Sequence, residues 1–345
     1  MGWRGDLSLG GQIGNGVSRG RAERLPEQDG LAQLRIEYLG EWLALGLAPG
    51  YAPSPDDNTE WRYDGTYVAV NQRGWTLAAG ATDRWWGPGQ QSSFLFESQS
   101  RPIPAVSLRR HADSRSPLAS MTGPWSVTIM GARLADRQDG PSDDFSLSET
   151  LYGARWTIKP TAGLTLGAGA HKQDAAGRNR DDIDTMALDA RYAHAIGTNM
   201  IGIYGQLARQ TVDQTDSNGW LAGLDWVTTA WHGEQRWFTE YETHDDDARA
   251  NAPSHHGDPI NQFGAQQDRT TSLGVHHYAG TGWNTGLVLQ HRNNPTTDNL
   301  NVARITYGHQ LLAGWLTLNA QIADDDLDTQ SGENWTAGAE WTYRF

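Results

Sequence analysis

The sequence predicts an all-β protein: a transmembrane, antiparallel, up-and-down β-barrel of about 18 strands. Three observations predict this fold. Segments of about ten residues alternate apolar and polar side chains, aromatic residues recur near the ends of these segments, and short connections alternate with long ones. The whole chain, residues 1–345, is then a single barrel.

Composition excludes several other classes. The chain has 16 Trp and 40 Gly but no Cys, which excludes a disulfide framework and thiol catalysis. Its longest apolar runs, 42–48 and 311–318, are too short for a membrane-spanning helix. The mean hydropathy of -0.62 is compatible with a barrel, because lipid-facing residues are interleaved with polar ones. A net charge of -14 argues against nucleic acid as a partner.

The alternation is clearest from residue 125 to the end of the chain. In segment 335–345 the odd-numbered residues are aromatic or Ala, whereas the even-numbered ones are mostly polar or Gly. In segment 184–194, Met186 and Leu188 alternate with Asp189 and Arg191. We expect the apolar set to face lipid and the charged set to face the lumen. A soluble β-sandwich also alternates, but the number of strands and the spacing of the aromatics disfavour it.

Two girdles of aromatic side chains are expected at the ends of the strands, where a membrane meets water. The Trp residues expected there are Trp61, Trp75, Trp125, Trp156, Trp220, Trp226, Trp283, Trp335 and Trp341. The chain ends on Phe345, which is typical of bacterial outer-membrane barrels. These features indicate a barrel rather than a sandwich.

Connections sort by length, as the short periplasmic turns and long outer loops of a bacterial barrel do. The short ones are 39–41, 71–74, 160–163, 195–199, 228–234, 279–282 and 309–313. The long ones are 18–29, 48–60, 135–148, 172–183, 210–218, 242–270, 292–300 and 323–334. The first strands are expected at 6–17, 30–38, 41–48, 60–71, 74–82 and 92–98.

An even number of strands places both termini on the periplasmic side of a Gram-negative outer membrane. Residues 99–124, rich in Pro, Arg and Ser, are too long for a periplasmic turn and too irregular for a strand pair. We expect them to form an insertion that folds into or beneath the lumen and occludes it like a plug. The chain begins without a recognisable signal peptide, so the sequence is expected to be a mature or shortened form.

The most unusual local sequence is Asp83-Arg84-Trp85-Trp86-Gly87-Pro88-Gly89. Pro restricts φ and Gly tolerates conformations closed to other residues, so the last three residues predict a rigid turn. The adjacent Trp side chains offer stacking planes for a sugar ring. From residue 83 to 115 there are five Arg and three acidic residues, a surplus of +2 that suits an acidic polysaccharide. The structural alternative, salt bridges and Trp packing that brace a plug, stays open for each residue.

This region, with residues 92–95 and 101–108, resembles the Wzi family of capsule assembly proteins. Further similar blocks follow the family order at 62–67, 123–126, 221–226 and 237–241, so the resemblance covers roughly residues 30–345. It implies a lectin-like outer-membrane barrel that binds capsular polysaccharide and helps to attach or organise the capsule at the cell surface. Family members carry a helical segment ahead of the barrel, which we expect to be absent here.

The predicted function is therefore non-enzymatic binding. The residues expected to bind polysaccharide are Asp83, Arg84, Trp85, Trp86, Arg101, Arg109 and Arg110, and those expected to form the structural turn are Gly87, Pro88 and Gly89. The expected partners are capsular polysaccharide, outer-membrane lipid and lipopolysaccharide, with no nucleic acid, and the protein is expected to be a monomer. The alternative is a passive porin, which would share all the barrel features.

Enzymatic and metal chemistry find little support in the sequence. Residues 16–20 match the Gly-x-Ser-x-Gly pattern of serine hydrolases, but that motif requires a strand-to-helix turn, whereas here it ends a strand. The His pairs at 255–256 and 276–277 and the Asp runs at 245–247 and 324–326 lack the spacing of known metal sites. We expect no catalytic residues, no metal and no cofactor.

Overall fold

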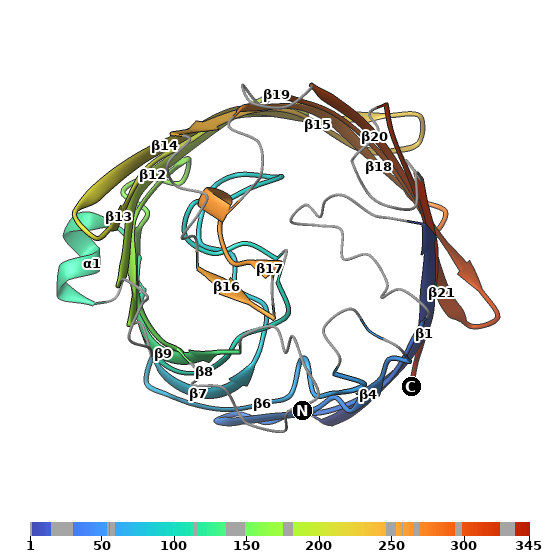
Figure 1. The fold of residues 1–345 in the computed structure, drawn as a ribbon, viewed down its shortest axis with the longest axis horizontal. Helices are drawn as coiled ribbons and strands as arrows, with labels where there is room; N and C mark the ends of the chain where they lie inside the picture. The colour runs from blue at the N-terminus through green and yellow to red at the C-terminus, as the bar shows by residue number, and fades with distance from the viewer. Residues whose placement is uncertain are drawn as a thin grey trace.

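The structure is a computed structural model that describes residues 2–14, 30–53, 55, 59–98, 100–113, 116–135, 149–174, 182–245, 253–256, 258–264, 269–293, 299–324 and 335–345. Over these ranges the chain forms one closed, antiparallel β-barrel around a wide lumen (Figure 1). Each wall strand is antiparallel to its neighbours in the sheet, so the backbone groups of the described wall are hydrogen-bonded within the sheet.

The described strands, in chain order, have the following bounds. The first half of the wall contains β1 (Gly2–Gly14), β2 (Leu31–Leu39), β3 (Leu43–Leu47), β4 (Gly50–Tyr51), β5 (Trp61–Arg62), β6 (Tyr67–Gln72), β7 (Trp75–Ala81), β8 (Pro104–Ala112), β9 (Trp125–Leu134), β10 (Glu149–Ile158) and β11 (Leu164–Asp174). The second half contains β12 (Ile183–Ile196), β13 (Asn199–Val212), β14 (Thr215–Ala230), β15 (Gly233–His244), β18 (Arg269–Ala279), β19 (Trp283–Asn293), β20 (Leu300–Leu311), β21 (Gly314–Ala323) and β22 (Trp335–Arg344).

The described wall is a sheet of 20 labelled strands. They form 18 staves, a stave being one complete crossing of the wall, because two of the crossings are interrupted and carry two labels each; the sequence predicted about 18 strands. β3 and β4 both pair with β2, so they are two parts of one interrupted stave. β5 pairs with β4 and β6 pairs with β3, so β5 and β6 form the next stave. A separate small hairpin, β16 (Ser254–His255) and β17 (Asp258–Pro259), lies inside the barrel and is followed by the 3-10 helix η2 (Gln262–Gly264) (Figure 1).

The barrel closes where β1 pairs with β22 in a register that places Asp6 opposite Arg344. Arg344 Nε lies 2.8 Å from Asp6 Oδ1, and the backbones of Gly5 and Phe345 exchange two hydrogen bonds of 2.8 Å. A Cβ on Gly5 would lie 2.4 Å from the Phe345 ring, so a larger residue here would displace that ring. Because Gly2 pairs with Leu39 just before the turn at 40–42, both described ends of the wall lie at its short-turn end.

The two faces of the wall differ as the alternation predicted. Apolar side chains such as Leu188 (63% exposed) and Leu207 (66%) cover the outside, and their sequence neighbours Asp189 and Gln206 point into the lumen. In β22, Trp335 and Tyr343 are outward and exposed, whereas Thr336 is only 1% exposed. An apolar outer face and a polar inner face are the arrangement of a barrel that spans a lipid bilayer.

The predicted short connections are tight turns, including residues 73–74, 197–198, 231–232 and 312–313. The connection predicted as long at 210–218 is instead a two-residue turn, Asp213 and Gln214, because β13 and β14 continue their pairing up to Val212 and Thr215. The sequence there is polar because the two strands extend beyond the apolar band. Most of the other predicted long connections lie outside the described residues.

Two predicted elements between residues 92 and 124 are wrong. Residues 92–98 are not a wall strand, and residues 99–124 are not one irregular insertion, since Pro104–Ala112 form β8 between β7 and β9. The physical reason is burial: Phe94, Leu95 and Phe96 are all buried, which a wall strand with one lipid face cannot achieve. The inward segment therefore comes before β8.

After β8, the chain forms the short helix α1 (Pro117–Thr122), which lies outside the wall (Figure 1). The Ser116 side chain caps its start by accepting a hydrogen bond of 3.2 Å from the Ala119 backbone N–H. Among the described residues, no helix is long and apolar enough to cross a membrane. This short helix lies in the connection between β8 and β9.

The turn between β20 and β21 provides a test of backbone strain. Ala313 has φ +62°, a left-handed conformation that costs non-glycine residues about 1–2 kcal/mol. We expect the free energy of unfolding of Ala313→Gly to exceed that of Ala320→Gly by about 1 kcal/mol or more. Glycine relieves the strain at residue 313, whereas at residue 320 it only weakens the extended backbone of β21. Denaturant titration of both variants in detergent measures the order, and equal stabilities would contradict this account.

Candidate functional site

Residues 82–103, here called the lumenal segment, connect β7 to β8 through the interior of the barrel (Figure 1). Its centre, Phe94, Leu95 and Phe96, is at most 2% exposed. These side chains form one buried cluster with inward residues of the wall, and with Ile260 and Phe263 from the small inner hairpin region. The Phe94 and Phe263 rings lie 5.0 Å apart. The lumenal segment therefore has a hydrophobic core of its own within a polar lumen.

Where the lumenal segment packs against the wall, glycine residues of the wall strands leave room for its side chains. A Cβ on Gly219 would lie 2.5 Å from the Phe94 ring, and one on Gly169 would lie 2.7 Å from Leu95 Cδ1. A Cβ on Gly153 would lie 3.2 Å from the Trp86 ring. Contacts below about 3.4 Å between carbon atoms are repulsive. These three glycines thus form recesses that receive the side chains of the lumenal segment.

Glu240 of β15 holds the turn that follows the Gly-Pro-Gly sequence. Its carboxylate accepts backbone hydrogen bonds from Gln90 (2.6 Å), Gln91 (3.1 Å) and Ser92 (3.2 Å). The Tyr204 hydroxyl donates a fourth hydrogen bond of 2.9 Å to the same carboxylate. Bonds to an ionised acceptor are the stronger kind, so Glu240 is the main polar anchor of the lumenal segment.

Glu242, two residues further along β15, joins the lumenal segment to the inner hairpin. Its carboxylate accepts hydrogen bonds from the Ser92 hydroxyl and from Gln262 Nε2, the latter at 3.0 Å. Two backbone bonds reinforce the junction: Glu97 N–H to the Ile260 carbonyl (2.9 Å) and Gln262 N–H to the Ser93 carbonyl (3.0 Å). The two inner elements therefore form one unit.

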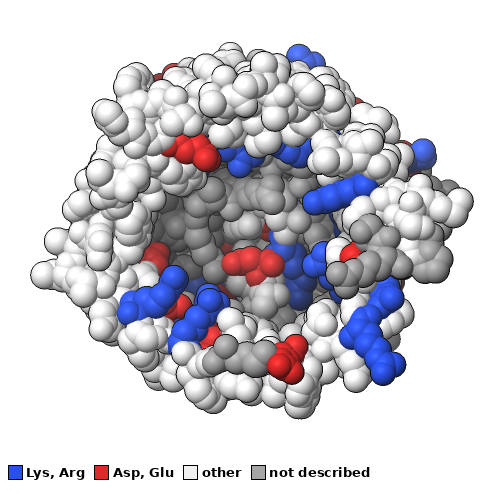
Figure 2. Space-filling view, turned by 180° about the vertical axis from the view of Figure 1, so that it is seen from behind, with Lys and Arg blue, Asp and Glu red and all other residues white. Residues whose placement is uncertain are grey.

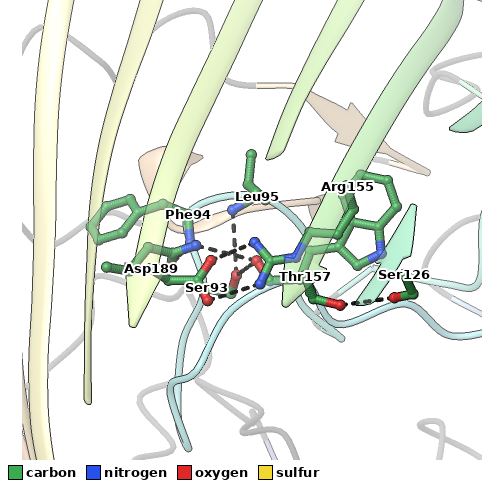
Figure 3. Close-up of polar contacts among 9 residues, drawn as sticks. Ser93, Phe94, Leu95, Ser126, Arg155, Thr157 and Asp189 are labelled. Carbon is green, nitrogen blue, oxygen red and sulfur yellow. Dashed lines mark hydrogen bonds and ion pairs between the residues drawn. The ribbon is translucent and has the colours of Figure 1, made fainter. Parts of the chain in front are cut away.

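A compact loop surrounds Ser93 beside the Arg155–Asp189 ion pair of the wall (Figure 3). Ser93 Oγ donates to the Trp86 carbonyl at 2.8 Å, and Gln206 Nε2 donates to the same carbonyl at 3.2 Å. Gln206 Oε1 in turn accepts from the Phe94 backbone N–H at 3.0 Å. The amide of Gln206 thus connects β13 to both ends of this loop.

Two of the arginines predicted to bind saccharide make contacts that brace the lumenal segment. Arg84 Nη1 donates to the carbonyls of Thr82 (3.1 Å) and Ile103 (2.7 Å), which ties the two ends of the lumenal segment together. Arg101 makes a two-point contact with Asp64, with Nε–Oδ2 and Nη2–Oδ1 distances of 3.0 Å. Burial lowers the pKa of Arg84, partly offset by the charge of Asp83. For both arginines the structural alternative accounts for the observed contacts.

The remaining predicted residues are not brought together at one place. Asp83 is exposed, Trp85 is half-buried, and Trp86 packs edge-on against Phe96 with the ring centroids 4.7 Å apart. Arg109 and Arg110 lie near the far end of β8, opposite Thr76 and Trp75. Arg110 lies over the Trp75 ring at 5.3 Å, on the outer face of the barrel. The cationic run in the sequence is therefore not a single patch, and Arg115 lies outside the described residues.

The predicted turn Gly87-Pro88-Gly89 is tight, but for a different reason. Neither glycine has a left-handed φ. Instead, a Cβ on Gly89 would lie 2.2 Å from the Ser92 carbonyl oxygen, and one on Gly87 would lie 2.5 Å from Ser93 Oγ. Glycine is required there because the chain folds back closely on itself.

Seen from one end, the barrel is hollow, and acidic and basic side chains gather in and around the opening (Figure 2). A pocket of about 640 Å³ lies between the turn at Gly87 and Pro88 and the wall. Its other lining residues are Gln90, Arg155, Lys159, Thr165, Asp189, Arg191 and Arg236. This volume is in the range of pockets that hold small ligands, about 300–1,000 Å³.

Sequence reasoning missed the wall residues that hold the lumenal segment, above all Asp64, Tyr204, Gln206, Glu240 and Glu242. For the four of them that lie in strands, the signal available was their parity, because polar residues at inward positions of strands face the lumen. Asp64 lies in the turn between β5 and β6 and carries no such signal. That signal identifies the face but not the partner, since each partner is distant in sequence. Asp64 and Glu240 do fall within the blocks that carried the family resemblance.

Comparison with known proteins agrees with this architecture. The family model for the capsule assembly protein Wzi matches residues 24–335. A Klebsiella pneumoniae protein described as an uncharacterised 55.8 kDa protein in the cps region is 25% identical over 158 residues. That match covers 44% of this chain but only 30% of the Klebsiella protein, so most of that protein has no counterpart in the match.

Solved structures show the same fold. The Escherichia coli protein Wzi, described as an outer membrane protein involved in group 1 capsule assembly and as a carbohydrate-binding β-barrel, has a TM-score of 0.78 at 18% identity. The alignment covers 99% of this chain and 84% of the E. coli chain. Pseudomonas aeruginosa OccK8 (OprE) has a TM-score of 0.64 at 9% identity, over 100% of this chain and 98% of its own. The fold is thus that of outer-membrane β-barrels.

Glu240 provides the first test of this site. We expect Glu240→Gln to weaken the seating of the lumenal segment by about 3 kcal/mol, because the charge that attracts three backbone N–H groups is lost. Limited proteolysis should then cut within residues 82–103 while the barrel keeps its heat-modifiable migration in gels. Glu234→Gln, an exposed position on the same strand, is the control. Equal protection in both variants would contradict the anchoring role.

Glu97 makes the seating sensitive to pH. Burial raises the pKa of this carboxyl to about 8, with a further rise from the charge of Glu240 and an opposing backbone hydrogen bond at Ser93. A pKa raised on folding stabilises the folded state fully below the unfolded pKa, and the stabilisation is lost as pH rises through about 8. We expect thermal stability to fall between pH 5 and 9, and to fall less in Glu97→Gln. If the melting temperatures of the parent and of Glu97→Gln fell equally across this pH range, the role of Glu97 would be refuted.

Proposed function

Because this chain belongs to the family of the capsule assembly protein Wzi, we propose that it is a non-enzymatic protein that binds capsular polysaccharide and helps to attach or organise the capsule at the cell surface. The family match over residues 24–335 carries this proposal. The fold supports it, since the E. coli barrel with a TM-score of 0.78 is itself described as carbohydrate-binding.

We place the barrel in the outer membrane of a Gram-negative bacterium, as a monomer in contact with lipid and lipopolysaccharide. The exposed apolar belt on the outer face supports the membrane location. In such barrels the short turns are periplasmic. Both described ends of the wall lie at the short-turn end, so the proposal puts both termini in the periplasm.

Within the lumen, we propose that the predicted residues have two different roles. Asp83 and Trp85, which keep exposed surface, contact the polysaccharide. Arg84, Trp86 and Arg101 hold the lumenal segment in shape through the contacts described above. An aromatic face beside a carboxylate suits a sugar ring, because its C–H surface stacks on the indole and its hydroxyls donate to the carboxylate.

Binding to polysaccharide is the direct test. The refolded protein in detergent should bind purified capsular polysaccharide from its own host, and bind dextran, a neutral glucan, much more weakly. Trp85→Ala should weaken binding about tenfold or more, the usual cost of truncating a Trp at an interface hot spot. Trp231→Ala, at an exposed turn tip 78% open to solvent, is the control. Equal affinity for the two glycans would refute the proposal.

Single-channel recording separates this function from that of a passive porin. With the lumenal segment seated against the wall, the proposal predicts no steady ion conductance across a planar bilayer. A large, constant conductance would favour the porin. Glu240→Gln should conduct ions where the parent protein does not, since the substitution loosens the anchor of the lumenal segment.

A further inference from the structure

The pocket under Gly87 and Pro88 is lined by an excess of basic side chains. Arg155, Lys159, Arg191 and Arg236 line it, against a single acidic residue, Asp189. They come from β10, the turn that follows it, β12 and β15, so the wall brings together residues far apart in the chain. In a protein with a net charge of -14, such a concentration of positive charge requires an explanation.

Ion pairs within the wall neutralise only part of this charge. Arg155 pairs with Asp189, with Nη2 2.9 Å from Oδ1. Arg191 and Arg236 share one carboxylate oxygen, Asp225 Oδ2, at 2.7 and 2.9 Å. In the part of the chain that the structure describes, Lys159 is exposed and has no ion pair. Four cations therefore face two carboxylates.

Asp225 is more deeply buried than Arg191 and Arg236, the two arginines that pair with it. The Asp225 side chain is 2% exposed, whereas those of Arg191 and Arg236 are 25% and 34% exposed. Within the described structure, Arg191 Nη1 and Arg236 Nε are buried and lack a hydrogen-bond acceptor. A buried donor without an acceptor is unfavourable, so these groups favour a ligand that supplies oxygen atoms.

Arg191 is also held in position. Its guanidinium lies 5.5 Å from the centre of the Tyr204 ring, and the Tyr204 hydroxyl donates to Glu240, the anchor of the lumenal segment. Asp225 fixes the other side of the guanidinium. Little side-chain entropy is then lost when an anion binds, which is the advantage of a preorganised site.

We propose that this pocket binds the anionic group of an acidic saccharide, a sugar carboxylate or a sugar phosphate. The planar guanidinium groups match the paired oxygens of either anion, and the volume of about 640 Å³ accommodates a sugar ring. The saccharide as ligand rests on the proposed function, whereas the preference for an anion rests on the charges alone.

The test uses the full refolded chain in detergent and three probes, glucuronate, glucose 6-phosphate and glucose, with binding followed by ligand-observed NMR. One or both anionic probes should bind at least tenfold more tightly than glucose. Their relative affinity tells the carboxylate from the phosphate. Equal binding of all three probes would overturn the proposal.

Variants locate the site. Arg236→Gln with Lys159→Gln should weaken binding of the anionic probe about tenfold or more, and Asp225 keeps Arg191 as its partner. Lys159→Gln alone removes a charge without breaking an ion pair, and should weaken binding severalfold. Arg209→Gln, which removes an exposed arginine paired with Asp216 far from the pocket, should have no effect. Unchanged binding in the double variant would overturn the proposal.

The same variants test the pocket proposal separately from the proposed function. If the parent binds capsular polysaccharide and the double variant binds it equally well, the pocket proposal fails while the proposed function stands. If the parent binds glucuronate through this pocket but does not bind the polysaccharide, the pocket proposal stands and the proposed function fails.

Discussion

Closure of the sheet is the constraint on which the rest of the structure depends. Once β22 pairs with β1, every wall residue faces either lipid or lumen. The closed sheet has no edge strand with unpaired backbone N–H and C=O groups. A polar lumen follows, because the outer face takes the apolar residues. Anything that folds inside must therefore be held mainly by directed contacts. The carboxylate of Glu240 and the ion pair between Arg101 and Asp64 are such contacts, and they surround a small apolar core at Phe94.

Strand period predicted the barrel, the number of staves and the faces of most strands, since these depend on local alternation and on connection length. It failed at residues 92–98, because a short apolar run such as Phe94-Leu95-Phe96 suits a strand as well as a buried coil. It also could not identify the contacts of Arg84 and Arg101. Their partners, the Ile103 carbonyl and Asp64, are distant in sequence, so only the folded chain shows that both arginines brace the lumenal segment.

The family match and the structure of the lumen give complementary information about the proposed binding of a saccharide. The family match supports the proposed role in capsule assembly, but the family fold alone does not specify how a saccharide is held. The lumenal segment provides a rigid inner surface, and the pocket beside it provides charge. Rigid recesses at Gly153, Gly169 and Gly219 fix the segment against the wall, so any binding surface that it forms is preorganised.

Tyr204 lies between two contacts, since its hydroxyl meets Glu240 and its ring faces Arg191. This makes the pocket and the lumenal segment parts of one thermodynamic cycle. If release of the segment changes the affinity of the pocket for an anion by some factor, then the anion must change the equilibrium of release by the same factor. An occupied pocket would thereby act as a latch or as a trigger, and the sign of that single coupling free energy decides which.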